Sequence, residues 1–313
     1  HDMKKLAIGV DIGGINTAFG LVDENGDLYA ESVISTKKYP SVDDYPAYVE
    51  DLCQAMHALA DSLSFEYELA GIGIGAPNAN YHKGTIETPA NLWKFREDEP
   101  NPDESRRIFP LVEDIARCFG GVKTLMTNDA NAATIGEMVY GNAKGMRDFI
   151  MVTLGTGLGS GFVANGEMIY GSDGFAGEFG HIHMYNNNIL CHCGKTGCIE
   201  TEVSGRAIQR KLIERIHSGE ASLLAPKVRS GETVTTADII GAVEREDPLC
   251  IELVMQAGSE LGHHIAGLIN LFNPEVIVIG GNLAQAEPCY FLQPIELAVR
   301  KYSLKLMSQN VPI

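Results

Sequence analysis

The first part of the chain alternates apolar runs of strand length with turn residues. Three such runs, 4–11, 17–23 and 27–35, predict strands. They are followed by residues 42–63, where apolar side chains recur every three or four positions, the spacing of an amphipathic helix. We therefore expect a β-sheet with a helix packed against it.

The pattern then alternates between strand and helix. Residues 70–76 predict a buried strand, and the proline-rich stretch 78–110 predicts loops and short pieces. Residues 122–127 predict a strand that ends directly before Asn128 and Asp129, which open an alanine-rich helix. This order is typical of α/β proteins.

The C-terminal part is predicted to be rich in helix. Helices are expected at 204–217 and 261–272, with a loop-rich stretch at 219–234 between them. The strand predicted after the second helix ends at Gly280 and Gly281.

Two segments share the same order of features. In each, an apolar strand leads into a glycine-rich turn, a second strand and an Asn-Gly hairpin signal. The turns run from Asp11 to Gly14 and from Gly155 to Gly161. Two such hairpins imply two related α/β domains that face each other. We place them at 1–121 and 122–313, with the last helix free to pack back on the first domain.

Composition limits the classes of function. A chain of 313 residues with 45% hydrophobic residues and 34 glycines is long enough for two domains with ample cores. Its formal charge of −17 argues against a nucleic-acid-binding surface. No run of about 18 apolar residues and no secretory leader occurs, so we expect a cytoplasmic protein without a membrane partner. Seven cysteines, an odd number, suit a reducing compartment.

Glycine-rich turns after strands can bind phosphate, because backbone N–H groups approach the ligand where no Cβ atom interferes. Neither turn has the P-loop pattern, and neither opens a helix as a dinucleotide fingerprint does. Taken singly, each is more often an ordinary turn. The pair of similar turns, the first led by the acidic Asp11, favours a nucleotide site in which Asp11 orients the water shell of Mg²⁺.

Residues 181–200 carry the densest chemistry in the chain. Three of the seven cysteines, Cys191, Cys193 and Cys198, lie within eight positions, and His181 precedes them. These are the residue types of a tetrahedral zinc site, and two glycines allow the loop to turn tightly. A site with four protein ligands is closed, so the zinc is expected to be structural. The alternative is a reduced cysteine loop without metal.

Six motifs, in order along the chain, support a family resemblance. They run from Asp11 to Gly14, Asn128 to Ala133, Leu154 to Gly161, Gly177 to His181, Cys191 to Glu200 and Ile279 to Asn282. In this set the chain resembles the ROK family of sugar kinases and related repressors, over nearly its whole length. The resemblance implies a two-domain α/β fold of the actin and hexokinase type (ribonuclease-H-like). It also implies ATP and Mg²⁺ in an interdomain cleft, and phosphorylation of a hexose or hexosamine.

The resemblance implies that Asp129 is the general base. Its place at a helix start also has a purely structural explanation, because Asn and Asp are favoured as N-caps. In the functional interpretation, the helix dipole keeps Asp129 ionised while its carboxylate accepts the proton of the attacking sugar hydroxyl. Asn128 is then a hydrogen-bond partner of the sugar.

Further sugar contacts are implied for Glu178, His181 and Glu200, since carboxylates are strong acceptors for hydroxyl groups. His181 is expected to bind zinc through one ring nitrogen and a sugar hydroxyl through the other, so that the metal fixes the sugar-binding wall. Standing alone, Glu178 and Glu200 would be interpreted as solvated surface charges. Asn91 lies near the only tryptophan, in a loop that is either a sugar contact or a hydrophobic anchor.

The nucleotide side is assigned to the glycine turns and their neighbours: Asp11, Gly13, Gly14, Thr156, Gly157, Gly280 and Gly281. Three features depart from the family pattern. Ile15 and Asn16 replace a threonine and often a lysine, and Thr17 is not expected to supply the missing hydroxyl. The loop at 76–80 is poorer in glycine than usual. The chain stops at Ile313 without the usual closing strand and helix, so we expect the given sequence to be incomplete at its C-terminus.

Together these features predict an ATP-dependent hexose kinase acting on glucose or a related hexose, with the 6-hydroxyl as the expected acceptor. The family also contains kinases for fructose, mannose, allose and N-acetylated hexosamines. A sugar-sensing transcriptional regulator is disfavoured by the short segment before Asp11, which leaves no room for a winged helix, and by the acidic charge. A catalytically weak sugar-binding protein is disfavoured by the presence of Asp129. We expect a homodimer or a higher homo-oligomer.

Overall fold

The computed structural model describes residues 3–100, 102–308 and 311–313. The chain divides into two compact units, which we call unit 1 (His1–Gly136 with Tyr170–Ala176) and unit 2 (Glu137–Ile169 with Gly177–Ile313). The division falls later than the predicted boundary at 121. The reason is that strand β8 (Thr124–Thr127) pairs with strand β4 (Tyr67–Gly75) of unit 1, so the break lies inside the following helix.

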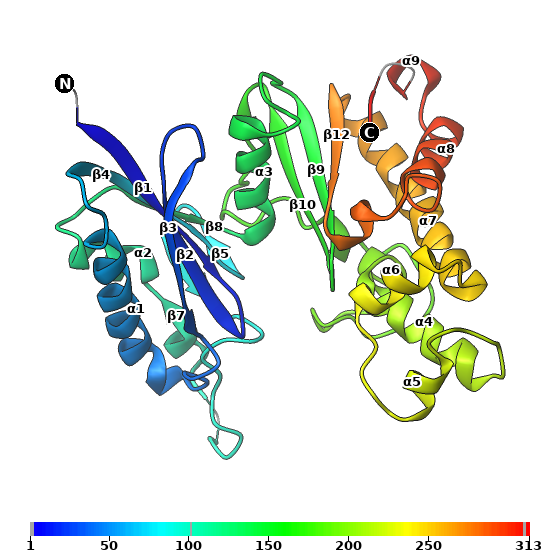
Figure 1. Cartoon of the computed structure of the whole chain (residues 1–313), viewed down its shortest axis with the longest axis horizontal. Helices are drawn as coiled ribbons and strands as arrows, with labels where there is room; N and C mark the ends of the chain where they lie inside the picture. Colours follow the sequence, from blue (N-terminus) through cyan, green and yellow to red (C-terminus); the bar gives the residue numbers. More distant parts are fainter. Residues whose placement is uncertain (1–2, 101, 309–310) are drawn as a thin grey trace. The chain divides into compact units, whose positions relative to one another are not determined.

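Unit 1 is built on a five-stranded sheet in the order β3-β2-β1-β4-β8 (Figure 1). Its first three strands are β1 (Lys4–Ile12), β2 (Asn16–Val22) and β3 (Leu28–Ser35). They form an antiparallel meander, whereas β4 and β8 run parallel to β1. The strands predicted from the apolar runs are confirmed, with ends that differ by three residues or fewer.

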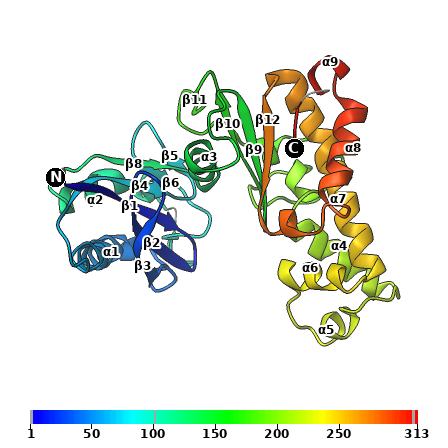
Figure 2. The ribbon, with the colours of Figure 1, turned by 45° about the horizontal axis from the view of Figure 1, so that its top comes forward.

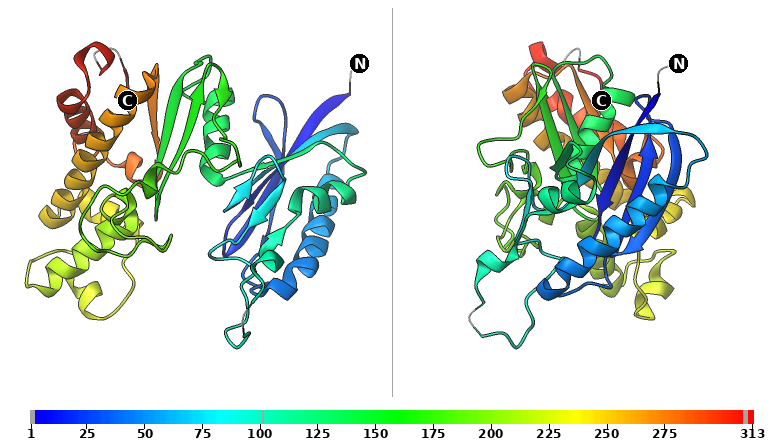
Figure 3. Two further views of the ribbon diagram at one scale, coloured as in Figure 1. Left: turned by 180° about the vertical axis from the view of Figure 1, so that it is seen from behind. Right: turned by 90° about the vertical axis from the view of Figure 1, so that its left-hand side faces the viewer.

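Two helices, α1 (Tyr45–Ala60) and α2 (Leu111–Cys118), lie side by side along this sheet (Figures 1 and 3). Helix α1 follows a 3₁₀ turn, Val42–Asp44, whose capping box at Ser41 starts the helical segment. Its Tyr48, Leu52 and Met56 are fully buried in the core of unit 1. The predicted amphipathic helix is therefore confirmed.

The proline-rich stretch forms short pieces, as predicted. A small sheet joins β5 (Ala79–Asn80), β6 (Thr85–Glu87) and β7 (Ile108–Phe109), and a 3₁₀ turn spans Glu104–Arg107. Trp93 is fully buried, with its ring centroid 5.0 Å from that of Tyr45 and 4.8 Å from that of Phe109. The Arg107 guanidinium donates to the carbonyls of Leu92 and Trp93. Trp93 is thus the hydrophobic anchor of its loop.

Unit 2 repeats the strand plan of unit 1. Its sheet has the order β11-β10-β9-β12, with β9 (Phe149–Leu154), β10 (Leu158–Ala164), β11 (Glu167–Met168) and β12 (Val276–Gly280). Strand β10 pairs antiparallel with β9, and β12 pairs parallel with it, just as β2 and β4 pair with β1. The duplication inferred from the two glycine-rich hairpins is therefore present in the topology of both sheets.

Beyond its sheet and the loop that carries the cysteines, unit 2 is mostly helical. They are α4 (Gly205–His217), α5 (Ala225–Arg229), α6 (Thr236–Glu244), α7 (Pro248–Phe272), α8 (Leu292–Tyr302) and α9 (Lys305–Ser308). Helices α7 and α8 lie side by side (Figures 1 and 2). The helix predicted at 261–272 is only the second half of α7, which begins at Pro248 because Asp247 caps it through the Cys250 N–H.

Helix α3 (Asp129–Tyr140) crosses the boundary between the units. Within the described ranges, no helix is long and apolar enough to span a membrane.

The first prediction concerns Gly281, which has φ 97° and ψ 174°, a conformation open almost only to glycine. A Cβ atom there would lie 2.1 Å from the Leu154 carbonyl oxygen. We expect Gly281→Ala to lower the free energy of unfolding by about 3 kcal/mol, from strain and overlap together. The measurement is urea denaturation.

Gly231→Ala is the matched control, since Gly231 also has a positive φ but open space around its Cβ position. It should cost only about 1 kcal/mol. An equal decrease in the free energy of unfolding in the two variants would show that the overlap with the Leu154 carbonyl does not contribute to the cost.

Candidate active site and metal centre

In unit 1, the pairing of three parallel strands places the predicted site residue Asp11 in line with two residues that the sequence did not single out. Asp11 on β1 pairs with Gly75 on β4, and Gly75 pairs with Thr127 on β8. Asp129 follows two residues later, at the start of α3. A Cβ atom on Gly75 would lie 3.4 Å from Asp129 Oδ1, so the absent side chain leaves room for the carboxyl group above this strand. Asp11 and Asp129 therefore lie close enough to interact.

The Asp129 carboxyl has a strongly perturbed acidity. Although the residue keeps an exposed surface, crowding by protein atoms around the carboxyl, followed by the charge of Asp11 and a hydrogen bond to it, raises the pKa of Asp129 to about 7. This differs from the expectation that the helix dipole keeps Asp129 fully ionised. Desolvation and a like charge outweigh the helix terminus here. A carboxyl with a pKa near neutrality is suited to exchange protons.

Asn128 performs the structural role that helix starts require. Its Oδ1 accepts the Asn131 N–H at 2.7 Å, so Asn128 caps α3 and leaves Asp129, the next residue, with its carboxylate free of capping. Both polar atoms of the buried Asn131 side chain lack a hydrogen-bond partner among the described residues.

The first glycine turn is closed by a hydrogen bond from the Gly13 N–H to the Asn16 carbonyl, at 2.9 Å. Ile15 is exposed at its tip. The Thr17 hydroxyl is buried and hydrogen-bonded to those of Thr36 and Tyr48, so it is not available at the turn. A Cβ on Gly14 would lie 3.4 Å from Asn91 Cβ, which places the exposed Asn91 beside this turn.

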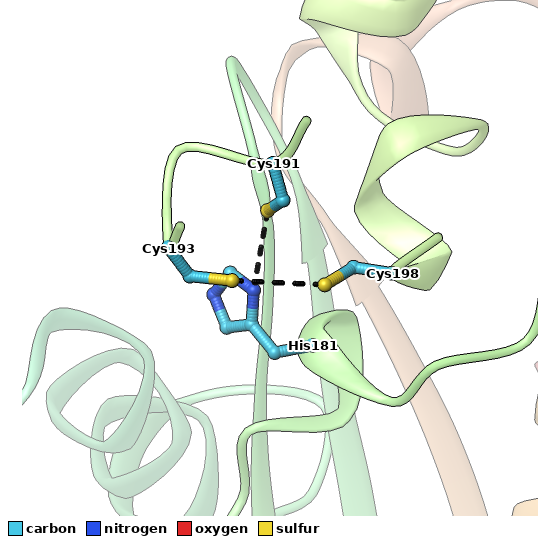
Figure 4. Close-up of side chains that lie close together, drawn as sticks. All are labelled: His181, Cys191, Cys193 and Cys198. Atoms are coloured by element: carbon cyan, nitrogen blue, oxygen red, sulfur yellow. Dashed lines mark hydrogen bonds between the residues drawn. The ribbon is translucent and has the colours of Figure 1, made fainter. Parts of the chain in front are cut away.

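In unit 2, the four predicted zinc ligands converge (Figure 4). Cys193 Sγ lies 3.6 Å from Cys198 Sγ, and Cys191 Sγ lies 3.5 Å from His181 Nδ1. The four ligand atoms all lie within 4.8 Å of one another. Tetrahedral zinc with Zn–S bonds of about 2.3 Å needs sulfur atoms about 3.8 Å apart, whereas a disulfide needs about 2.05 Å. The residues therefore fit a zinc ion.

Local backbone structure forms this centre. Cys191 N–H donates to the Lys195 carbonyl and Gly194 N–H to the Cys191 carbonyl, which closes the turn between the first two cysteines. The loop is attached to α7 by Tyr185, whose hydroxyl donates to Glu260 at 2.5 Å and lies 2.6 Å from His264 Nε2. Burial raises the pKa of the Cys191 thiol to about 12, so a cation is needed to hold it as a thiolate at neutral pH.

Three further polar residues surround the metal centre. His181 Nε2, the ring nitrogen turned away from the cysteines, lies 3.8 Å from Glu178. Glu200 is 7% exposed; its Oε1 accepts the Leu158 N–H at 2.8 Å and its Oε2 lies 2.7 Å from His192 Nδ1. Desolvation and the nearby Glu200 raise the pKa of Glu178, against the opposing effect of His181. The set predicted for the sugar in this unit is therefore brought together.

The second glycine turn is less open than the phosphate-binding turn that the sequence predicts. A Cβ on Gly157 would lie 2.4 Å from Glu200 Oε1, so Gly157 is needed to accommodate this carboxylate. Gly155 has open space around it, and Thr156 is exposed. Gly281 packs on the Leu154 carbonyl at the end of β9 and Gly280 beside Met151. Only part of this turn is accessible to a ligand.

The predicted residues thus fall into two groups. Unit 1 holds Asp11, Gly13, Gly14, Asn91, Asn128 and Asp129, and unit 2 holds Thr156, Gly157, Glu178, His181, Cys191, Cys193, Cys198, Glu200, Gly280 and Gly281. The sequence interpretation missed Gly75 and His192. The place of Gly75 beside Asp11 follows from the register of the paired strands, which only the structure gives. His192 is visible in the sequence only as a histidine between two cysteines.

The duplicated α/β architecture places the chain in the actin and hexokinase-like class of folds, as its solved neighbours do. The ROK family model matches residues 7–313, and the chain belongs to this family.

Relatives of the chain include both kinases and regulators. The chain is 33% identical over 303 residues to a glucokinase of Halalkalibacterium halodurans, covering 95% of this chain and 86% of the relative. It is 32% identical over 309 residues to the DNA-binding transcriptional dual regulator NagC of Escherichia coli, covering 98% of this chain and 70% of the regulator.

Similar solved structures also include a kinase and a regulator. A ROK family glucokinase from Streptomyces griseus, in complex with glucose and AMPPNP, is 30% identical with a TM-score of 0.75, covering 95% of this chain and 89% of the glucokinase. A ROK family regulator homologous to the Escherichia coli Mlc protein is 26% identical with a TM-score of 0.84, covering 98% of this chain and 73% of the regulator. The family is therefore established, and kinases and regulators both lie within it.

The second prediction tests the metal centre. Purified, reduced protein should contain about one zinc per chain by elemental analysis. Cys193→Ala should lose the metal on dialysis and lower the melting temperature, because Glu200 and the loop share contacts with the ligands. It should also weaken sugar binding before nucleotide binding.

Cys289→Ala, a change at an exposed cysteine outside the cluster, is the matched control and should keep the zinc. Parent protein without bound metal would remove the ligand assignment. Sugar affinity that survives complete chelation would refute the idea that the metal positions the substrate.

Proposed function

We propose that the protein is an ATP-dependent hexose kinase that transfers the γ-phosphoryl group to a hydroxyl of glucose or a related hexose, with the 6-hydroxyl as acceptor. The observation that carries this proposal is the Asp11–Asp129 pair, in which one carboxyl has a pKa of about 7. A group of that acidity at a helix start is suited to accept a proton at neutral pH.

Asp129 would remove the proton of the attacking sugar hydroxyl as the oxygen–phosphorus bond forms. The bond from the γ-phosphorus to the bridging oxygen of ATP then breaks, and ADP leaves. Catalysis of this kind depends on position and on stabilisation of charge on the phosphoryl oxygens more than on covalent chemistry. Glu178, His181 and Glu200 are the proposed contacts to the other hydroxyl groups of the sugar, and the family resemblance adds Asn91 and Asn128.

Bound Mg²⁺ would supply neutralisation of charge on the phosphates, and the carboxylate oxygens of Asp11 suit its preference for hard ligands. The proximity of Asp11 to Asp129 supports this role, since two neighbouring carboxyl groups create local negative charge that a cation offsets. The Gly14 N–H and the exposed Thr156 are the proposed phosphate contacts, whereas the N–H groups of Gly13 and Gly155 already donate to the carbonyls of Asn16 and Gly157. Gly280 and Gly281 would lie toward the adenosine.

A sugar-sensing regulator is the second candidate, favoured by the likeness to the Mlc homologue at a TM-score of 0.84. The two proposals differ in one measurement. A kinase releases ADP in the presence of its sugar, whereas a regulator binds the sugar without turnover. A coupled ADP-release assay over glucose, fructose, mannose, allose and N-acetylated hexosamines distinguishes them and identifies the substrate.

The third prediction is the loss of turnover in Asp129→Asn. The amide keeps the size of the carboxyl but cannot accept the proton, so kcat should fall by about 10²–10⁴-fold while sugar affinity stays within about tenfold. Asp27→Asn, at an exposed turn of the same unit, is the control and should retain the parental rate. Turnover within about threefold of the parent in Asp129→Asn would exclude this residue as the base.

The fourth prediction is a pH profile. A general base must be deprotonated, and the deprotonated fraction of a group with a pKa of about 7 rises with pH through that value. The parent kcat/KM should therefore increase between about pH 6 and 8, whereas an ordinary Asp near 3.9 would give a flat profile there. Flat kcat/KM over this interval would contradict the role of the perturbed carboxyl.

A further inference from the structure

Behind the first glycine turn, three buried hydroxyl groups are hydrogen-bonded to one another. Thr17 Oγ1 lies 2.7 Å from Thr36 Oγ1 and 2.7 Å from the hydroxyl oxygen of Tyr48, and all three side chains are buried. Among the described residues, the hydroxyls of Thr36 and Tyr48 have no other hydrogen-bond partner. A hydroxyl group can donate one hydrogen bond and accept others, so Thr17, in the middle, satisfies both of its neighbours.

The three hydroxyl groups come from three segments that meet at the turn. Thr17 is the second residue of β2, directly after the turn, whereas Thr36 follows the last residue of β3 and Tyr48 lies on α1. The residue after Thr36, Lys37, donates its N–H to the Ile15 carbonyl at 3.0 Å. The segment after β3 is therefore attached to the turn at two points, by a hydroxyl group at its base and by a backbone hydrogen bond at its tip.

The polar character of Thr17 is unusual for its position. Residues of β2 that face the core are otherwise apolar, as Phe19 and Leu21 are. A buried hydroxyl group is costly unless it is hydrogen-bonded, so an apolar side chain would meet the demands of packing more simply. Hydrogen bonds add what apolar contacts lack, a preferred distance and direction. The three hydroxyl groups therefore specify where the start of β2 lies relative to α1.

We propose that Thr17 is a positioning residue for the nucleotide: its buried hydroxyl fixes the base of the first glycine turn, so that the Gly14 N–H is directed at a phosphate group. This inference rests on the proposed nucleotide site and adds to it a residue that does not touch the ligand. The Gly13 N–H is already bonded inside the turn, to the Asn16 carbonyl, so the direction of the Gly14 N–H matters more.

Two variants remove the Thr17 hydroxyl with different effects on stability. Thr17→Val leaves the hydroxyls of Thr36 and Tyr48 buried without a partner, so its melting temperature should fall. The triple variant Thr17→Val, Thr36→Val, Tyr48→Phe removes all three hydroxyl groups. Because no buried hydroxyl of the set is then left unpaired, its melting temperature should return toward that of the parent.

Two further variants are controls. Thr17→Ser keeps the hydroxyl group and loses only a methyl group. Thr124→Val removes another buried hydroxyl of unit 1, which donates to the Val122 carbonyl at 3.0 Å, at the start of β8 and away from the turn. This variant should be destabilised while the nucleotide site stays intact.

The experiment is calorimetric titration of each protein with ATP in the presence of Mg²⁺, with thermal unfolding of the same samples. Misalignment of a hydrogen bond to a charged group weakens binding by roughly ten- to a hundredfold, so Thr17→Val and the triple variant should both bind ATP at least about tenfold more weakly than the parent. Thr17→Ser and Thr124→Val should stay within about threefold of the parent.

ATP affinity that returns in the triple variant together with its melting temperature would overturn the positioning role, because Thr17 would then act through stability alone. Parental affinity in Thr17→Val, or a loss in either control as large as in Thr17→Val, would overturn it as well. If Thr17→Val does not fold, the triple variant replaces it in the comparison.

The titration reports on Thr17 even without turnover. A parent that binds ATP and releases no ADP would refute the kinase proposal alone, whereas a parent that does not bind ATP would refute both proposals.

Discussion

The burial of one carboxylate, Glu200, organises the functional side of unit 2. A charged group at 7% exposure must have polar partners. Its Oε1 accepts the Leu158 N–H at the start of β10, and its Oε2 lies 2.7 Å from His192 Nδ1 in the loop between the cysteines. Gly157 has no side chain to obstruct the carboxylate. The cysteine loop, the second glycine turn and the predicted sugar residues of unit 2 are therefore in contact through Glu200, and a change in one of them is expected to act on the others.

In unit 1, by contrast, the two carboxyl groups of the candidate site lie beside each other. Asp11 and Asp129 are brought together across Gly75, and desolvation together with the charge of Asp11 raises the pKa of Asp129 to about 7. Glu200 accepts a backbone hydrogen bond from Leu158, whereas crowding and the like charge of Asp11 raise the pKa of Asp129. These conditions match the roles proposed for the two residues, a hydroxyl contact for Glu200 and proton acceptance for Asp129.

Duplication explains why both features stand at strand ends. In each unit a hairpin and a parallel strand share the same pairing, so the turns after β1 and β9 occupy equivalent places. The copies have diverged in use. The turn at Gly13 and Gly14 borders the exposed Asn91. In the second turn, the Glu200 carboxylate occupies the space beside Gly157, and Gly155 and Thr156 stay accessible. Similar sequence signals therefore correspond to different local environments.

The sequence by itself determined the main strands, the repeat and the cluster of His181, Cys191, Cys193 and Cys198, because these depend on local periodicity and on residue types at short spacing. The order of six motifs was enough to identify the family. It did not determine the full length of α7, the burial of Trp93 or the acidity of Asp129. Only tertiary structure decided that Gly75 lies beside Asp129 and that His192 reaches Glu200. Strand register and loop closure place these residues, and both depend on pairing between distant segments that no local pattern records.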